Sequence, residues 1–171
     1  MTGDELGRHR EQLVHSVVFE HLGPADLDLV LPSCRLLEVS PGQVILAEGK
    51  KGDGLHVILE GEVEVFLPVN VGDGLKRRSS LQLNVLGPGR CFGEYGLVDD
   101  SPSSASVRAV VPTRLCSLPR ADFRRITDQN DRIGKVIYSN LLRFLIRRLR
   151  LKDQELDLVL LVEEKPAPHP A

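Results

Sequence analysis

The sequence contains no tryptophan and one methionine, and its three cysteines lie far apart. Cys34, Cys91 and Cys116 are odd in number and match neither a metal-site spacing nor a disulfide framework. We therefore predict reduced, partly buried thiols, no metal site and a cytoplasmic location. No apolar run approaches the roughly 18 residues that a membrane-spanning helix needs. The N-terminal segment MTGDELGRHREQ is polar and charged, which argues against a signal peptide.

Charge of one sign is not in excess either. The 22 Lys and Arg residues against 24 Asp and Glu residues give a net charge of −2, so the composition makes no case for nucleic acid binding. The chain has no nucleophile, base and acid at a recognisable spacing, and no metal-dependent hydrolase motif. We therefore do not expect an enzyme. A length of 171 residues suits one domain with an appendage.

What the sequence does contain is a β-rich middle between two helical segments. Apolar residues at helical spacing predict helices over 10–31, with an interruption at Gly23-Pro24. Between Arg35 and Pro119, short β-branched runs alternate with turns that contain Gly and Pro, as in a β-sandwich or barrel. The expected strands are Gln43–Leu46, Leu55–Leu59, Glu62–Leu67, Leu81–Leu86, Ala105–Val111 and Arg114–Leu118.

After Pro119 the pattern becomes helical again. We expect a short helix over Arg120–Thr127, capping residues over 128–131, and a long helix from Arg132 to Val162. The chain accordingly divides into N-terminal helices and barrel over 1–127, a long C-terminal helix over 128–163 and a disordered tail over 164–171. The predicted fold class is mainly β with flanking α-helices.

The long helix carries two apolar stripes. The first, which suits packing on the barrel, consists of Ile133, Val136, Ile137 and Leu141. The second repeats in steps of four and three, as a heptad pattern broken by Lys152. It predicts a homodimer whose interface comprises Tyr138, Leu142, Leu145, Leu149 and Leu156. The alternative is that one broad stripe covers the chain's own core.

The segment Cys91–Arg108, CFGEYGLVDDSPSSASVR, combines a Gly-Glu turn, a short apolar run, an acidic turn and small hydroxyl residues. Glycine lets the backbone approach a ligand closely, and the N–H groups of a loop or helix start can hold a phosphate. The Glu94 carboxylate suits a ribose hydroxyl, which can donate to it. Ser104 offers a hydroxyl and an N–H to a phosphate oxygen. These features are typical of a phosphate-binding segment.

Residues from about Leu13 to Ile126 resemble a bacterial cyclic nucleotide-binding domain of the catabolite activator type. The matching pieces, in order, are Pro41-Gly42, Val44-Ile45, Glu48-Gly49, His56–Val63, Phe92-Gly93-Glu94 and Ser104-Ala105-Ser106-Val107. The resemblance implies a double-stranded β-helix, or jelly-roll, barrel with cAMP or cGMP as the candidate ligand and no other cofactor. It also implies a ligand site that includes Phe92, Gly93, Glu94, Tyr95, Ser103, Ser104 and Ala105.

The chain departs from this family at Ser103, where the family usually has an arginine that pairs with the phosphate. Loss of such a charge-assisted contact costs on the order of 1.5–3 kcal/mol. Three outcomes stay open: no nucleotide binds, a cyclic nucleotide binds weakly or with Arg108 or Arg90 as a substitute, or a different ligand binds. Arg108 lies on the side of Ser106 along its strand, so its reach into the site stays open.

We predict a non-enzymatic regulatory or adaptor protein that signals to an unidentified protein partner through its C-terminal helix. Transcription factors of the family follow this helix with a winged helix-turn-helix, whereas a short proline-rich segment follows it here, so sequence-specific DNA binding is not expected. Arg143, Arg147 and Arg150 form a basic stripe that is either a solvated face or a contact for an acidic partner. The rival interpretation is a ligand-independent scaffold with a degenerate pocket.

Overall fold

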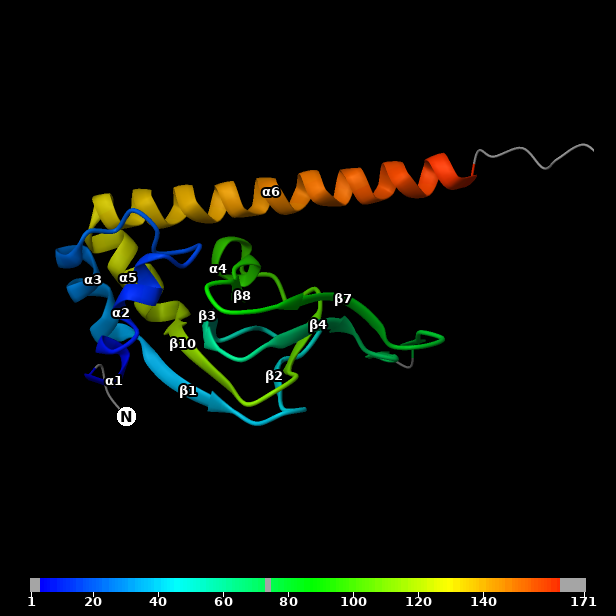
Figure 1. The fold of residues 1–171 in the computed structure, drawn as a ribbon, viewed down its shortest axis with the longest axis horizontal. Coiled ribbons are helices and arrows are strands. Elements are labelled where there is room, and N and C mark those ends of the chain that lie inside the picture. Colours follow the sequence, from blue (N-terminus) through cyan, green and yellow to red (C-terminus); the bar gives the residue numbers. More distant parts are fainter. Residues whose placement is uncertain (1–3, 73–74, 164–171) are drawn as a thin grey trace, which may run out of the picture.

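The structure, a computed structural model, describes residues 4–72 and 75–163 and contains a β-barrel flanked by helices (Figure 1). One four-stranded antiparallel sheet has the order β1-β10-β3-β8 and the other has the order β2-β9-β4-β7. The strands are β1 Arg35–Val39, β2 Val44–Leu46, β3 Gly54–Glu60, β4 Val63–Leu67, β7 Leu81–Leu86, β8 Cys91–Phe92, β9 Ser106–Ala109 and β10 Thr113–Pro119. A small hairpin of β5 Asn70–Gly72 and β6 Leu75–Lys76 extends from them. The predicted mainly β fold is confirmed.

The barrel interior is filled by apolar side chains from both sheets. Strand β3 shows how the sequence produces this, because its residues 54–59 are all buried. Ile58 points into the barrel cluster, whereas Leu55, Val57 and Leu59 belong to the cluster under the helices. A strand that is covered on both faces has a continuous run of apolar residues in its sequence, not an alternation of apolar and polar residues. The barrel cluster consists of Val39, Leu46, Ile58, Val63, Phe92, Val107, Ala109 and Leu115.

The turn between β3 and β4 requires glycine. Gly61 has φ +86°, a conformation that residues with a Cβ rarely adopt. A Cβ placed there would lie 2.5 Å from the Pro112 carbonyl oxygen and 2.5 Å from the Thr113 hydroxyl oxygen. The turn between β3 and β4 therefore packs directly against the turn that precedes β10.

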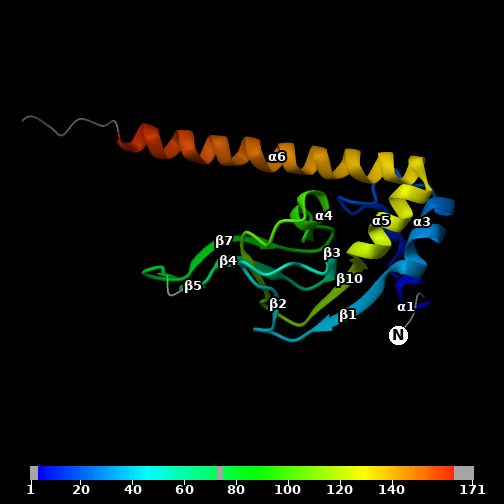
Figure 2. The same ribbon diagram turned by 180° about the vertical axis from the view of Figure 1, so that it is seen from behind.

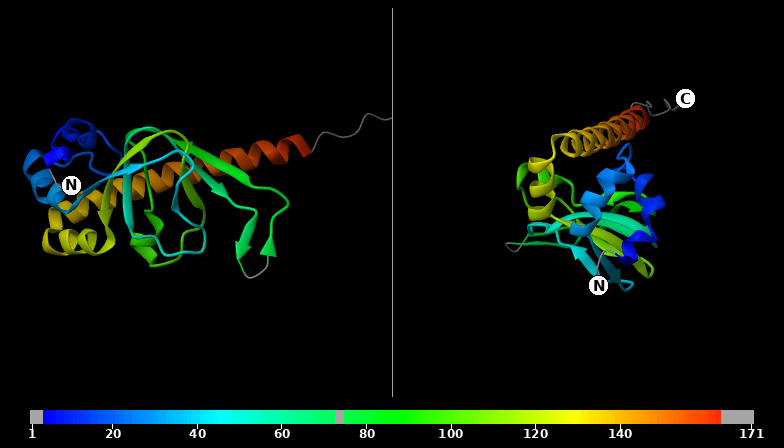
Figure 3. Two further views of the ribbon diagram at one scale, coloured as in Figure 1. Left: turned by 90° about the horizontal axis from the view of Figure 1, so that it is seen from below. Right: turned by 90° about the vertical axis from the view of Figure 1, so that its left-hand side faces the viewer.

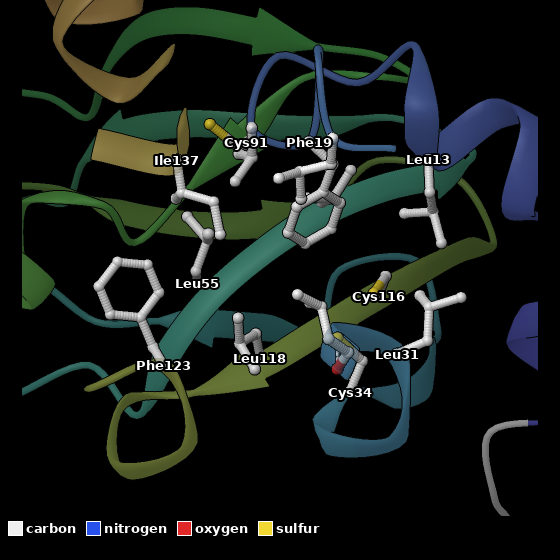
Figure 4. Packing of buried hydrophobic residues seen from close by; sticks show 14 of the residues in the cluster. Leu13, Phe19, Leu31, Cys34, Leu55, Cys91, Cys116, Leu118, Phe123 and Ile137 are labelled. Atoms are coloured by element: carbon white, nitrogen blue, oxygen red, sulfur yellow. Dashed lines mark hydrogen bonds between the residues drawn. The ribbon is translucent and has the colours of Figure 1, made fainter. Parts of the chain in front are cut away.

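The flanking helices are α1 Asp4–Gly7, α2 Arg10–Val14, α3 Pro24–Val30 and α5 Arg120–Gln129, with a 3-10 turn at Leu31–Ser33. The predicted helices over 10–31 are only partly observed, because α2 ends at Val14 and residues 15–21 form turns instead. The second helix is observed, since α3 starts at Pro24 and the Gly23 N–H donates to the Asp26 carboxylate at 2.8 Å. These helices enclose the larger apolar cluster with β3 and β10, and Figure 4 shows Leu55 between Phe19 and Phe123 in it.

The long helix α6 spans Asp131–Glu163 and lies along the barrel (Figures 1 and 2). The side-chain oxygen of Asn130 caps its start by accepting the Ile133 N–H at 3.1 Å. Ile133 and Ile137 are fully buried, as expected for the stripe that packs on the domain. The Asn140 side chain adds a polar anchor by donating to the Val18 carbonyl oxygen at 2.9 Å. The predicted long C-terminal helix is confirmed.

The second stripe of α6 is only partly covered. The Tyr138 ring meets the Phe123 ring edge-on at 5.6 Å, and Leu145 packs against the core beneath the helix. Leu149 and Leu156 are exposed, like every side chain from 149 to 161. Figure 3 shows this end of the helix continuing beyond the barrel.

The dimer interface on this stripe stays a prediction, as does the division of the chain at 127 and 163. The predicted disordered tail, 164–171, lies outside the described residues.

Candidate ligand-binding site

A cavity of about 520 Å³ lies between the barrel, helix α4 (Tyr95–Asp99) and helix α6. This volume is within the range of about 300–1,000 Å³ that is typical of small-ligand pockets. Helix α4 is a short helix inside the segment Cys91–Arg108, and it lies beneath α6 in Figure 1. Apolar side chains dominate the lining, which consists of Leu46, Gly52, Val65, Leu83, Leu86, Phe92, Gly93, Glu94, Tyr95, Gly96, Ser103, Ser104, Ala105, Leu145, Arg148, Leu149 and Lys152.

The turn between β8 and α4 is held close to strand β3. The Phe92 ring stacks on the buried His56 ring at 5.0 Å, and Gly93 follows with φ +84°. A Cβ at Gly93 would lie 2.4 Å from the Gly54 carbonyl oxygen, so only glycine allows the backbone to come this close to β3. The close approach places Glu94 at the start of α4, directed into the cavity.

The Glu94 carboxylate is buried and paired with α6. Its Oε1 accepts a hydrogen bond from Nη1 of Arg148 at 2.7 Å, and only 4% of the Glu94 side chain is exposed against 37% for Arg148. Burial raises the pKa of Glu94, and the Arg148 guanidinium opposes that rise without cancelling it. The ion pair therefore joins the predicted ligand segment directly to the C-terminal helix.

Two aromatic rings hold the Arg148 guanidinium in place. Its central carbon lies 5.6 Å from the Tyr95 ring centre and 5.6 Å from the Phe144 ring centre. These distances are within the range of cation–π attraction. A long, flexible side chain is thus positioned at the cavity before any ligand arrives.

The acidic turn after α4 is tied to α5. Asp100 adopts a left-handed conformation with φ +58°, and its carboxylate pairs with Arg120 and, at 2.6 Å, with Arg124. The Arg124 guanidinium keeps the pKa of Asp100 below its ordinary value. Arg120 also donates its backbone N–H to the Asp53 carbonyl oxygen at 2.9 Å. The α4 segment is therefore fastened to the helix that leads into α6.

The sequence profile of the cyclic nucleotide-binding domain matches residues 36–130. The chain belongs to the cyclic nucleotide-binding domain family. It is 35% identical to the cyclic AMP receptor protein of Thermus thermophilus over 144 residues, which are 84% of this chain and 62% of that protein. It is 30% identical over 142 residues to a cAMP-dependent protein kinase regulatory subunit of Eremothecium gossypii, covering 83% of this chain and 29% of that protein. The chain thus spans less than two thirds of the length of these relatives.

Solved structures agree with this assignment. The catabolite activator protein of Thermus thermophilus matches with a TM-score of 0.69 at 33% identity, over 84% of this chain and 63% of that one. A cyclic nucleotide-binding domain from Methylobacillus flagellatus matches with a TM-score of 0.78 over 95% of this chain and 88% of that one. Its 22% identity supports the fold alone. The two relatives of 30% identity or more given above are named as a receptor and as a regulatory subunit.

The cyclic nucleotide-binding domain brings most of the predicted site residues together. Seven of them line the cavity: Phe92, Gly93, Glu94, Tyr95, Ser103, Ser104 and Ala105. Arg108 does not line it, because its guanidinium pairs with Glu64 at 2.6 Å and lies 4.4 Å from the Phe66 ring centre. Arg90 is exposed and does not line it either. Neither of the two arginines considered as substitutes at Ser103 therefore reaches the cavity in this structure.

Helix α6 contributes to the site, which was not predicted from the sequence. Leu145, Arg148, Leu149 and Lys152 line the cavity from above. Three of these belong to the stripe that was assigned to a dimer, and Arg148 falls between them at helical spacing. The available signal was that Arg148 stands three residues after Leu145 and four before Lys152, so all three share one helix face. The spacing places a residue on a face but does not say what covers that face.

The described residues, 4–72 and 75–163, give little support for metal binding, membrane insertion or thiol chemistry. No group of three or more His, Cys, Asp or Glu side chains there could hold a metal ion. None of the helices in these ranges is long and apolar enough to cross a membrane. All three cysteines are buried as free thiols, and burial raises the pKa of Cys91, which makes it a poor nucleophile.

Proposed function

We propose that this cyclic nucleotide-binding domain is a regulatory sensor that binds cAMP or cGMP in the cavity between α4 and α6. In this proposal it catalyses no reaction. The observation that carries the proposal is the cavity itself, which gathers Gly93, Glu94, Ser104 and Ala105 around one space beside apolar walls. Family membership and the name of the Thermus thermophilus relative, a cyclic AMP receptor, support the choice of ligand.

The proposed output passes through α6. A ligand in the cavity would touch the barrel side and, at Leu145 and Leu149, the helix side at the same time. Its binding free energy would therefore depend on where α6 lies, and occupancy would favour one helix position over others. The exposed apolar residues Leu142, Leu149 and Leu156 suit a second copy of the helix, so we include homodimerisation in the proposal. A cytoplasmic location and a protein partner complete it.

A ligand-independent scaffold is the second candidate function, and two observations favour it. Ser103 brings no positive charge to the cavity, and the Glu94 carboxylate already has a partner in Arg148. In that case the Glu94–Arg148 pair would serve only to fasten α6 to the barrel. The exposed half of α6 would then recruit its partners at all times.

Isothermal titration calorimetry with cAMP and cGMP, together with the melting temperature, tests the proposal. We expect saturable heat and a higher melting temperature with a cyclic nucleotide, and a weaker effect with 5′-AMP. Ala105→Leu, which adds bulk at the cavity wall, should lose binding, whereas Leu158→Lys on the exposed end of α6 should retain it. No heat and no shift at millimolar cAMP and cGMP would favour the scaffold.

A further inference from the structure

The charged side chains around the cavity divide by element. Among the described residues that line it, the barrel and α4 supply one charged side chain, the anionic Glu94. Helix α6 supplies the cations, Arg148 and Lys152. Any anionic group in the cavity must therefore find its counter-charge on the helix. The lining thus holds two cations and one anion, and Lys152 also pairs with Glu155, outside the lining, at 2.5 Å. Because that pair is exposed, an anionic ligand group can compete with Glu155 for Lys152.

The two cations are arranged to act together. Arg148 and Lys152 are four residues apart, so they lie one turn apart on the same face of α6. Arg148 is held between Tyr95 and Phe144, yet 37% of its side chain remains exposed. The guanidinium has five N–H donors, and its bond to Glu94 uses one of them. The remaining donors are available to a second acceptor.

We propose that Arg148 and Lys152 of α6 bind the anionic group of the ligand, which the barrel side of the cavity gives no cation to hold. The inference rests on the proposed function and names the residues that hold the ligand's charge. Arg148 bridges Glu94 and the ligand, and Lys152 turns from its exposed partner Glu155 to add a second contact, with 61% of its side chain accessible. Glu94 keeps acceptor sites for ligand hydroxyl groups. The ligand class is a monoanionic phosphodiester that carries hydroxyls, as cAMP and cGMP do.

This arrangement makes ligand affinity depend on helix position. In a pocket whose cations belong to the barrel, the helix can move without losing the main electrostatic contact. Here both cations belong to α6, so a displacement of α6 also removes them from the ligand. Weak binding would follow whenever α6 is held away from the barrel.

Single-residue variants of the full chain, titrated calorimetrically with cAMP and cGMP, test the proposal. Arg148→Gln should weaken binding by about ten- to a hundredfold, the usual effect of losing a charge-assisted hydrogen bond. Lys152→Gln should cost less than about tenfold, because its charge is more exposed. The matched controls are Arg147→Gln and Arg150→Gln, which remove the same charge from exposed positions outside the lining. Both controls should bind as the wild type does.

Two further variants keep the test informative if Arg148→Gln disturbs the fold. Arg148→Lys retains the charge and should bind better than Arg148→Gln at an equal melting temperature. Ser103→Arg combined with Arg148→Gln places a cation on the barrel side instead and should restore affinity. Raising the salt concentration should weaken binding to the wild type more than binding to Arg148→Gln.

The outcomes separate this inference from the proposed function. Wild-type binding with no difference between Arg148→Gln and Arg147→Gln would overturn the inference and leave the sensor function standing. Binding by Ser103→Arg but not by the wild type would also overturn it, because the cations of α6 would then be insufficient. Absence of binding in the wild type and in Ser103→Arg would overturn both.

Discussion

Replacing Ser103 by arginine should strengthen cyclic nucleotide binding. Ser103 lines the cavity, and its backbone is fixed: its N–H donates to the Lys50 carbonyl oxygen and its carbonyl oxygen accepts the Gly49 N–H, both at 2.8 Å. The side chain at this position borders the cavity of about 520 Å³. A longer side chain at position 103 therefore has room to extend without moving the backbone.

The magnitude follows from the contact that would be gained. A charge-assisted hydrogen bond contributes about 1.5–3 kcal/mol, and each 1.4 kcal/mol changes affinity about tenfold. Ser103 is half-buried, so water screens part of this gain and the lower half of the range applies. We expect Ser103→Arg to lower the Kd for cAMP by about ten- to fortyfold.

Calorimetric titration of the wild type, Ser103→Arg and Ser103→Gln measures the effect. Glutamine is long and polar but uncharged, so it separates added charge from added contact. We expect Ser103→Gln to stay within about threefold of the wild type, because it lacks the charge. Equal affinities for Ser103→Arg and Ser103→Gln would refute the electrostatic explanation. A loss of binding in both would show that the position has no room.

Three further predictions concern stability and assembly. Because burial raises the pKa of Glu94, the folded state holds more protons than the unfolded state above about pH 4.5, so the free energy of unfolding should fall as pH rises through the raised pKa. Denaturation of the wild type and Glu94→Gln between pH 4 and 8 should show this fall in the wild type alone, and parallel curves would contradict it. Gly93→Ala should cost about 1–3 kcal/mol in urea denaturation, because its Cβ would meet the Gly54 carbonyl oxygen at 2.4 Å. Leu156→Lys should halve the mass seen by light scattering, whereas Leu158→Lys, off the stripe, should not. A dimeric mass in both variants would exclude this interface.

The strands were predictable where turn residues mark both of their ends. The runs Leu55–Leu59 and Leu81–Leu86 stand between glycine- or proline-containing turns, and both appear as strands at nearly the predicted limits. Strands β1 and β8 were missed for different reasons. The two residues of β8 are too few to show a period, and Arg35–Val39 carries two adjacent leucines that hide the alternation.

The candidate site was predictable on the barrel side only. Phe92, Glu94 and Ser104 are close in sequence, so their proximity in the fold follows from a local segment. Arg148 lies 54 residues after Glu94, and pairing over that separation depends on how α6 crosses the barrel. The spacing of α6 residues indicated a second apolar face, but it could not distinguish a cavity roof from a dimer contact.

The ion pairs at Asp100 give small movements of α4 a large effect. Asp100 links the cavity segment to Arg120 and Arg124 on α5, and only Asn130 separates α5 from α6. Helix α6 has 33 residues, so at about 1.5 Å per residue it is a lever arm of about 50 Å. A tilt of about 5° at the junction would sweep its far end through about 4 Å, nearly the pitch of one helical turn. A small tilt of α6 at its junction with α5 would therefore be amplified into a displacement of several ångströms at the exposed end, about twice that at the cavity.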